Sequence, residues 1–197
     1  APLVAAGAPE ETPPEKMGEY IEIDDLRPRP KVTICGVVVR QKPPYWLGWP
    51  GTSYDLDAHR KEYEGAFAKM AKRVGVEFAM EEPPLESAEA VAAFVGKLKE
   101  QRPDAVMLHV QHLAVWDWVN TIALAGVPTI IWAPIGTAFT GHVVELSRRQ
   151  GVHVISSLET SAMEQAFRMI RAKKQFEATR LVVVAGDKRQ ETALERL

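Results

Sequence analysis

Cysteine is nearly absent from this sequence, and so are the features of membrane-spanning and nucleic-acid-binding proteins. The single cysteine, Cys35, cannot form an internal disulfide, and its position in the apolar run Val32–Val39 predicts a small buried side chain. The longest apolar runs, such as Val127–Ile135, contain prolines and fall short of the roughly 20 residues that a membrane span needs. Lys and Arg total 24 against 26 Asp and Glu, without a basic cluster, so nucleic acid is not an expected partner.

Several motifs of known chemistry are also missing. Neither G-x-G-x-x-G nor G-x-x-x-x-G-K-[ST] occurs, which argues against a dinucleotide or nucleoside triphosphate, and no G-x-S-x-G supplies a hydrolase nucleophile. Ser156, three residues before Glu159, is interpreted as part of a helix-capping box. We expect no catalytic set and no metal site in this chain. The acidic residues after the second predicted strand are interpreted as solvated charges; they are Glu81, Glu82, Glu86 and Glu89.

What is present is a regular alternation of short apolar runs with segments of helical period. This alternation predicts a three-layer α/β fold, with a doubly wound, Rossmann-like parallel sheet of about six strands. Glycines precede valines at Gly75, Gly126 and Gly151, where a left-handed residue would end each helix before the next strand. The predicted strands are Val32–Val39, Val76–Met80, Ala105–Val110, Thr129–Ala133, Val152–Ser156 and Leu181–Ala185.

The two ends of the chain differ from this regular part. Residues 1–30 hold six of the fourteen prolines and predict a disordered or extended tail, followed by the α/β domain over residues 31–186. Residues 187–197 are interpreted as the start of a further segment. An Ala-rich start without an initiator Met fits either a removed export signal or a trimmed sequence, so extracytoplasmic and cytoplasmic locations stay open.

In an open parallel sheet, ligands bind outside the carboxyl ends of the strands. The loop after the first strand, Arg40–Tyr54, is long and rich in aromatic residues, among them Tyr45, Trp46 and Trp49. Such rings can stack on the apolar face of a sugar. Contact with a partner domain and packing within the loop itself are the alternatives.

Polar residues follow the third and fourth predicted strands. Gln111, His112 and Trp116 come after the third strand, and Thr137 and His142 after the fourth. The two histidines could bind a polyol or act as acid and base near neutral pH. His109, which lies inside the third strand, is interpreted instead as a satisfied core histidine. Together with the three aromatic residues of the first loop, these five form the predicted ligand site.

The segment from Asp104 to His142, DAVMLHVQHLAVWDWVNTIALAGVPTIIWAPIGTAFTGH, resembles the amino-terminal domain of the L-fucose and L-arabinose isomerases. The likeness extends over about residues 31–186, and rests on strand order, the polar loop after the third strand and the Pro/Gly/Thr segment after the fourth. It implies a Rossmann-like domain without a metal, because in that family a divalent ion such as Mn²⁺ is bound by later domains.

The resemblance also implies a homo-oligomer, in which the first domain of one subunit helps to close the active site of its neighbour. Trp46, Trp49, Gln111 and His112 would then contact substrate or the adjoining subunit without taking part in chemistry. The chain is therefore interpreted as a non-catalytic recognition or oligomerisation domain of an isomerase-like protein that acts on small carbohydrates.

A different class of protein also fits the alternation of strands and helices. The first lobe of extracytoplasmic sugar-binding proteins has the same pattern, and an export-like amino terminus favours it. The long first loop and the fifth crossover, Leu158–Thr179, count against this alternative. Both interpretations predict a small carbohydrate as the ligand.

Overall fold

The computed structural model describes residues 22–43, 55–134 and 136–180. The predicted sixth strand, Leu181–Ala185, lies outside these residues, as does most of the predicted tail. The part of the tail that is described contains one turn of helix, α1 (Ile23–Leu26). No helix in the described ranges is long and apolar enough to cross a membrane.

Within the described residues, five parallel strands form one sheet, and the predicted α/β class is confirmed. Their order is β2-β1-β3-β4-β5, so the strand order reverses between β1 and β3. The predicted boundaries of these five strands were correct to within one residue at each end. The strands are β1 (Thr33–Val39), β2 (Glu77–Met80), β3 (Ala105–Val110), β4 (Thr129–Trp132) and β5 (Val152–Ile155).

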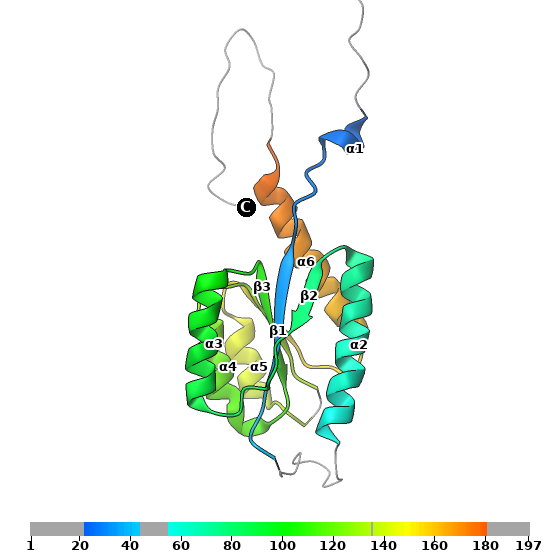
Figure 1. The fold of residues 1–197 in the computed structure, drawn as a ribbon. Helices are drawn as coiled ribbons and strands as arrows, with labels where there is room; N and C mark the ends of the chain where they lie inside the picture. The colour runs from blue at the N-terminus through cyan, green and yellow to red at the C-terminus, as the bar shows by residue number, and fades with distance from the viewer. Residues whose placement is uncertain (1–21, 44–54, 135, 181–197) are drawn as a thin grey trace, which may run out of the picture.

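Helices cover both faces of the sheet, which makes the fold three-layered and doubly wound (Figure 1). One face packs against α2 (Leu56–Val74) and α6 (Ser161–Ala178). The other packs against α3 (Ala88–Gln101), α4 (Trp116–Ala123) and α5 (Thr140–Ser147), with the short 3-10 helix η1 (Leu113–Val115) before α4. This division follows from right-handed crossovers on a sheet that grows in both directions from β1.

The side chains of β3 alternate between two hydrophobic cores. Val106, Leu108 and Val110 face α3, α4 and α5, whereas Ala105 and Met107 face α2 and α6. All six residues of β3 are buried, as expected for a central strand covered on both faces. The α2 face also holds a group of aromatic rings near the carboxyl end of the sheet; its members are Tyr63, Phe67 and Trp132.

The predicted helix-ending glycines adopt the left-handed conformation, with φ values of 77°, 81° and 79° at Gly75, Gly126 and Gly151. Gly75 caps α2 directly, and its N–H donates to the carbonyls of Ala71 and Lys72. The predicted capping box at Ser156 is wrong, because α6 begins only at Ser161 and its N-cap, Thr160, makes no side-chain cap. The Ser157 hydroxyl instead accepts from the backbone N–H of Glu159 in the connecting loop.

Substitution by alanine should have opposite effects on stability at two glycines, one inside α2 and one at its C-cap. Gly75→Ala should lower the free energy of unfolding by about 1 kcal/mol, because alanine is strained at positive φ. Gly65→Ala, in the exposed interior of the same helix with nothing within 4 Å of the new Cβ, should raise it by about 0.5–1 kcal/mol. Urea denaturation of both variants measures this contrast, and equal effects would contradict the role assigned to Gly75.

Candidate functional site

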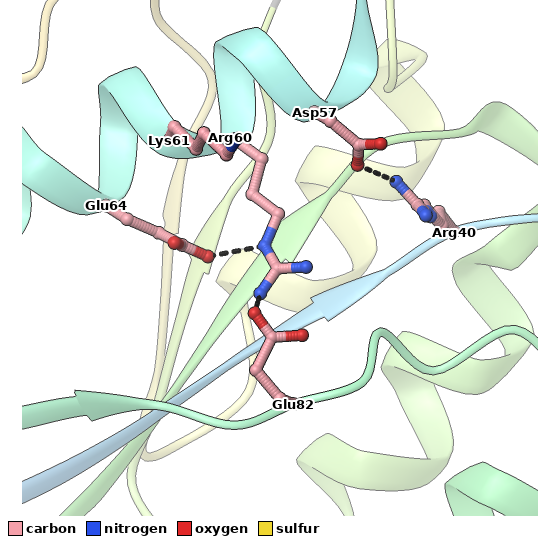
Figure 2. Close-up of a pocket in the computed structure, with 6 residues that line it drawn as sticks. All are labelled: Arg40, Asp57, Arg60, Lys61, Glu64 and Glu82. Atoms are coloured by element: carbon pink, nitrogen blue, oxygen red, sulfur yellow. Dashed lines mark hydrogen bonds and ion pairs between the residues drawn. The ribbon is translucent and has the colours of Figure 1, made fainter.

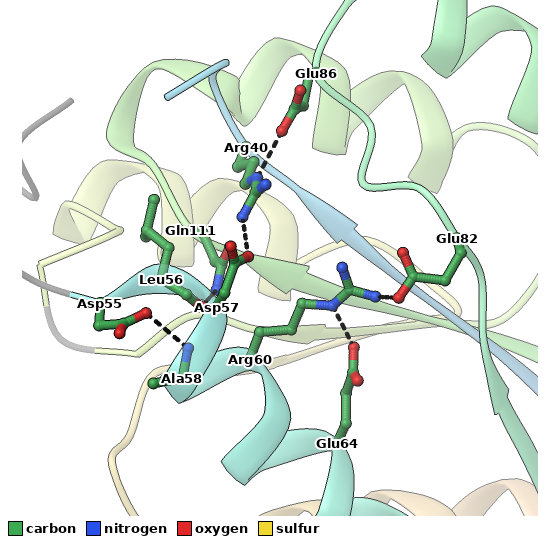
Figure 3. Close-up of polar contacts among 10 residues, drawn as sticks. All are labelled: Arg40, Asp55, Leu56, Asp57, Ala58, Arg60, Glu64, Glu82, Glu86 and Gln111. Carbon is green, nitrogen blue, oxygen red and sulfur yellow. Dashed lines mark hydrogen bonds and ion pairs between the residues drawn. The ribbon is translucent and has the colours of Figure 1, made fainter. Parts of the chain in front are cut away.

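The carboxyl ends of β1 and β3 mark the point where the strand order reverses, and polar groups converge there. Arg40 follows β1, Gln111 follows β3, and the first turns of α2 lie against both (Figure 3). The Gln111 side chain is buried, and its Nε2 donates to the carbonyl of Leu56 at 3.1 Å. This hydrogen bond fixes the start of α2 over the edge of the sheet.

Arg40 is the first charged group of the site, and it is only 8% exposed. Its Nε donates to Glu86 at 2.7 Å and its Nη1 to Asp57 at 3.0 Å. Burial alone lowers the pKa of Arg40, but the hydrogen bonds to Glu86 and Asp57 outweigh it and raise the pKa above its ordinary value. The guanidinium is therefore a permanent charge that links β1, α2 and the loop before α3.

Arg60 is the second buried cation and is likewise 8% exposed. Its Nε donates to Glu64, one turn further along α2, at 2.6 Å. Its Nη2 forms an ion pair with Glu82, which is carried by the loop after β2. The two carboxylates differ in exposure, since the side chain of Glu64 is 24% exposed and that of Glu82 is 66% exposed.

These groups line a hollow of about 370 Å³, at the lower end of the range of about 300–1,000 Å³ that is typical of small-molecule pockets (Figure 2). Four of the lining residues belong to α2 and recur at the spacing i, i+3, i+4 and i+7, which places them on one face of the helix. The lining holds three cations and three anions, so its formal charge is zero. The residues are Arg40, Asp57, Arg60, Lys61, Glu64 and Glu82.

The interpretation of these acidic residues as solvated charges was wrong for Glu81 and Glu86, whose side chains are mostly buried, and correct for the exposed Glu82 and Glu89. Glu86 binds Arg40, Glu82 binds Arg60, and Glu81 forms an ion pair with Lys97 of α3. Only Glu89 lies on an exposed helix face. The charged face of α2 was the available signal for this site, because it begins directly after the long loop that follows β1.

None of the predicted site residues that the structure describes lines this hollow. Trp116, Thr137 and His142 are brought together, but on the side of the sheet edge that faces α4 and α5. Trp116 Nε1 donates to the carbonyl of Thr137 at 2.8 Å, and its ring stacks on His142 with centroids 4.8 Å apart. The Thr137 hydroxyl is buried and donates to the carbonyl of Pro134 at 2.7 Å. These contacts organise the loop after β4.

The histidines at this edge also have local structural contacts. His112 Nδ1 accepts from the backbone N–H of Ala114 at 3.0 Å and so caps η1, while burial lowers the pKa of His112. His142 Nδ1 accepts from the N–H of Phe139 at 3.3 Å at the start of α5. The acid or base roles predicted for both histidines stay predictions. The aromatic residues Tyr45, Trp46 and Trp49 lie outside the described residues.

His109 points into the layer of α2 and α6 and is fully buried. It is not a satisfied core histidine, however, because neither ring nitrogen has a hydrogen-bond partner among the described residues. Its ring packs edge-on against Tyr63, with centroids 5.3 Å apart. Burial, followed by the nearby charges of Arg60 and His59, lowers the pKa of His109 to about 3.

Cys35 lies in β1. Its side chain is half-buried, and its Sγ donates to Glu81 Oε1 at 3.8 Å. Burial, together with the charge of Glu81, raises the pKa of the Cys35 thiol to about 11, so the thiolate is rare near neutral pH. Within the described ranges, no group of three or more His, Cys, Asp or Glu side chains is placed to hold a metal ion.

Comparisons with known proteins add little to this geometry. No protein-family model matches the sequence, and no curated protein matches it. Among solved structures, the fold is similar to that of a sugar ABC transporter from Yersinia enterocolitica subsp. enterocolitica 8081, with 13% identity and a TM-score of 0.40. The match covers 81% of this chain and 48% of the other, so this chain spans about half the length of that protein.

The buried His109 predicts an acid sensitivity of the fold. The unfolded chain takes up a proton near pH 6.5, whereas the folded chain does so only near pH 3, so stability falls as the pH falls through this window. Between pH 7 and pH 5 this effect amounts to about 2 kcal/mol. His109→Leu should lose less stability than the wild type over this range, as urea denaturation at each pH would measure. If the stabilities of the two proteins fell by the same amount as the pH is lowered, His109 would not be buried and neutral in the folded chain.

Proposed function

We propose that this domain recognises a small carbohydrate at the carboxyl edge of its sheet and does not itself carry out chemistry on it. The observation that carries the proposal is the hollow between Arg40 and Arg60. Its volume suits a compact ligand, and its walls alternate guanidinium donors with carboxylate acceptors. A sugar hydroxyl both donates and accepts a hydrogen bond, so adjacent hydroxyls match such a wall.

The charge balance of the hollow supports the same ligand class. A site for a phosphorylated ligand usually presents an excess of Arg, Lys or backbone N–H groups. Here each buried guanidinium is already held by two carboxylates, from Asp57 and Glu86 for Arg40 and from Glu64 and Glu82 for Arg60. The balanced lining argues against a ligand that brings several negative charges, such as a sugar phosphate.

In this proposal, the chain is the amino-terminal domain of an isomerase-like, homo-oligomeric protein whose divalent metal is bound by other domains. Tyr45, Trp46 and Trp49 would provide the stacking surface for the sugar. The alternative, the first lobe of a sugar-binding protein, uses the same edge and the same ligand class. Recognition by this hollow is therefore common to both interpretations.

Isothermal titration calorimetry of the full chain against a panel of pentoses and hexoses tests the proposal. We expect at least one sugar to bind, and Asp57→Ala to weaken that binding about tenfold, equivalent to about 1.4 kcal/mol. Asp57 lines the hollow and is exposed, and Glu86 still pairs with Arg40 when Asp57 is removed, so the fold should stay intact. Glu62→Ala is the matched control, because Glu62 is an exposed carboxylate on the same helix that does not line the hollow.

Two results would contradict the proposal. The first is the absence of binding across the panel at millimolar concentrations. The second is equal binding by Asp57→Ala and Glu62→Ala, which would place the sugar elsewhere on the chain.

A further inference from the structure

The ion pair of Arg60 and Glu82 joins two groups in very different surroundings. Arg60 is buried and held from α2 by Glu64, whereas Glu82 reaches it from the solvent side with most of its own side chain exposed. Glu82 lies in the loop after β2, and not in a helix or strand. The two residues that follow it are prolines. Arg60 is therefore fixed, and its outer partner is the less constrained of the two carboxylates.

The guanidinium of Arg60 has a further donor. Nε is used by Glu64 and Nη2 by Glu82, while the remaining terminal nitrogen, Nη1, points toward the Arg40 side of the hollow without a partner among the residues drawn (Figure 2). The two terminal nitrogens of an arginine form the geometry that binds a carboxylate through two parallel hydrogen bonds. Among the residues drawn in Figure 2, Nη2 is paired with a carboxylate, that of Glu82, and Nη1 with none.

From this geometry we infer that Glu82 occupies the place of a ligand carboxylate, and that the hollow takes an acidic sugar, a uronate or an aldonate. The inference rests on the proposed function and specifies its ligand. The ligand's carboxylate displaces Glu82 and binds Nη1 and Nη2 of Arg60, while its hydroxyls meet Asp57 and Lys61 on the same helix face. Glu82 then turns into solvent, where it is already largely exposed.

Replacement of the Glu82 carboxylate by that of the ligand also explains why the charge of the hollow is balanced without a ligand. One carboxylate replaces another, so the total charge around Arg60 does not change when the ligand enters. A sugar phosphate would bring additional negative charge next to Glu64, and is disfavoured for that reason. A neutral sugar would leave the ion pair in place and would bind only to the rest of the hollow.

In this inference, Glu82 competes with the ligand carboxylate for Arg60, and this competition can be measured. An occupied site lowers the apparent affinity of a ligand by the fraction of molecules in which the site is open. Removing the competitor with Glu82→Gln should therefore raise the affinity of the full chain for an acidic sugar about fivefold. The affinity for the matching neutral sugar should not rise in this variant, because a neutral sugar does not compete with Glu82 for Arg60.

The experiment compares D-galacturonate with D-galactose, and D-gluconate with D-glucose, by calorimetry at low ionic strength. Glu62→Gln is the control for the loss of one negative charge from an exposed position near the hollow. Arg60→Gln should remove the preference for the acidic member of each pair. Because Arg60 is buried and that variant could unfold, the Glu82→Gln result decides the inference by itself.

The outcomes separate this inference from the proposed function. Neutral sugars that bind as well as acidic ones, with no gain in Glu82→Gln, would overturn the acidic ligand and leave carbohydrate recognition standing. Tighter binding of glucose 6-phosphate than of the acidic sugars would also overturn it. Absence of binding by every sugar would contradict the proposed function itself.

Discussion

Arg40 and Arg60 are charged side chains held out of water, and the arrangement of the carboxyl edge depends on how they are compensated. An isolated buried cation costs several kcal/mol, whereas one with well-placed carboxylates and hydrogen bonds is tolerated. Four carboxylates from two segments meet this requirement, with Asp57 and Glu64 from α2 and Glu82 and Glu86 from the loop after β2. The pairing fixes α2 and this loop relative to the end of β1, and the hollow is the space between them.

The rest of the edge reinforces this arrangement. Gln111 holds the first turn of α2 through the carbonyl of Leu56, and Asp55 caps the same turn by accepting from the N–H of Ala58. Below them, Tyr63 and Trp132 pack around His109, so that an uncharged layer lies beneath the charged one. The hollow therefore combines a buried floor and one face of α2 with a wall at Glu82 whose side chain is largely exposed.

The strands and the turns that lead into them could be predicted from local sequence patterns. Runs of Val and Ile without polar alternation predicted buried parallel strands, and the glycines before Val76, Val127 and Val152 marked the turns that lead into them. These signals depend on neighbouring residues only. The start of α6 was missed because Ser156 and Glu159 have the spacing of a capping box, but the chain forms a loop there before Ser161.

The site was less predictable, for a physical reason. Arg40 pairs with Glu86, 46 residues away. No local sequence pattern indicates which acidic residue of the segment 81–89 will form an ion pair with which arginine. The polar residues after β3 and β4 follow strands, as residues of a ligand site would, but Gln111, Trp116 and Thr137 each donate a hydrogen bond to a backbone carbonyl of the same edge. The spacing of the charged residues of α2 indicates the site, because it places Asp57, Arg60, Lys61 and Glu64 on one face of the helix.

The central claim is that a ligand is recognised at the buried guanidinium of Arg60. Arginine-selective ¹⁵N NMR of the full chain tests it most directly, by following the Nε–H signals during titration with whichever sugar of the panel binds. The account predicts that the signals of Arg60 and Arg40 shift together as the site saturates, while that of the exposed Arg168 on α6 stays in place. Saturable sugar binding that leaves the Arg60 signal unmoved would contradict it.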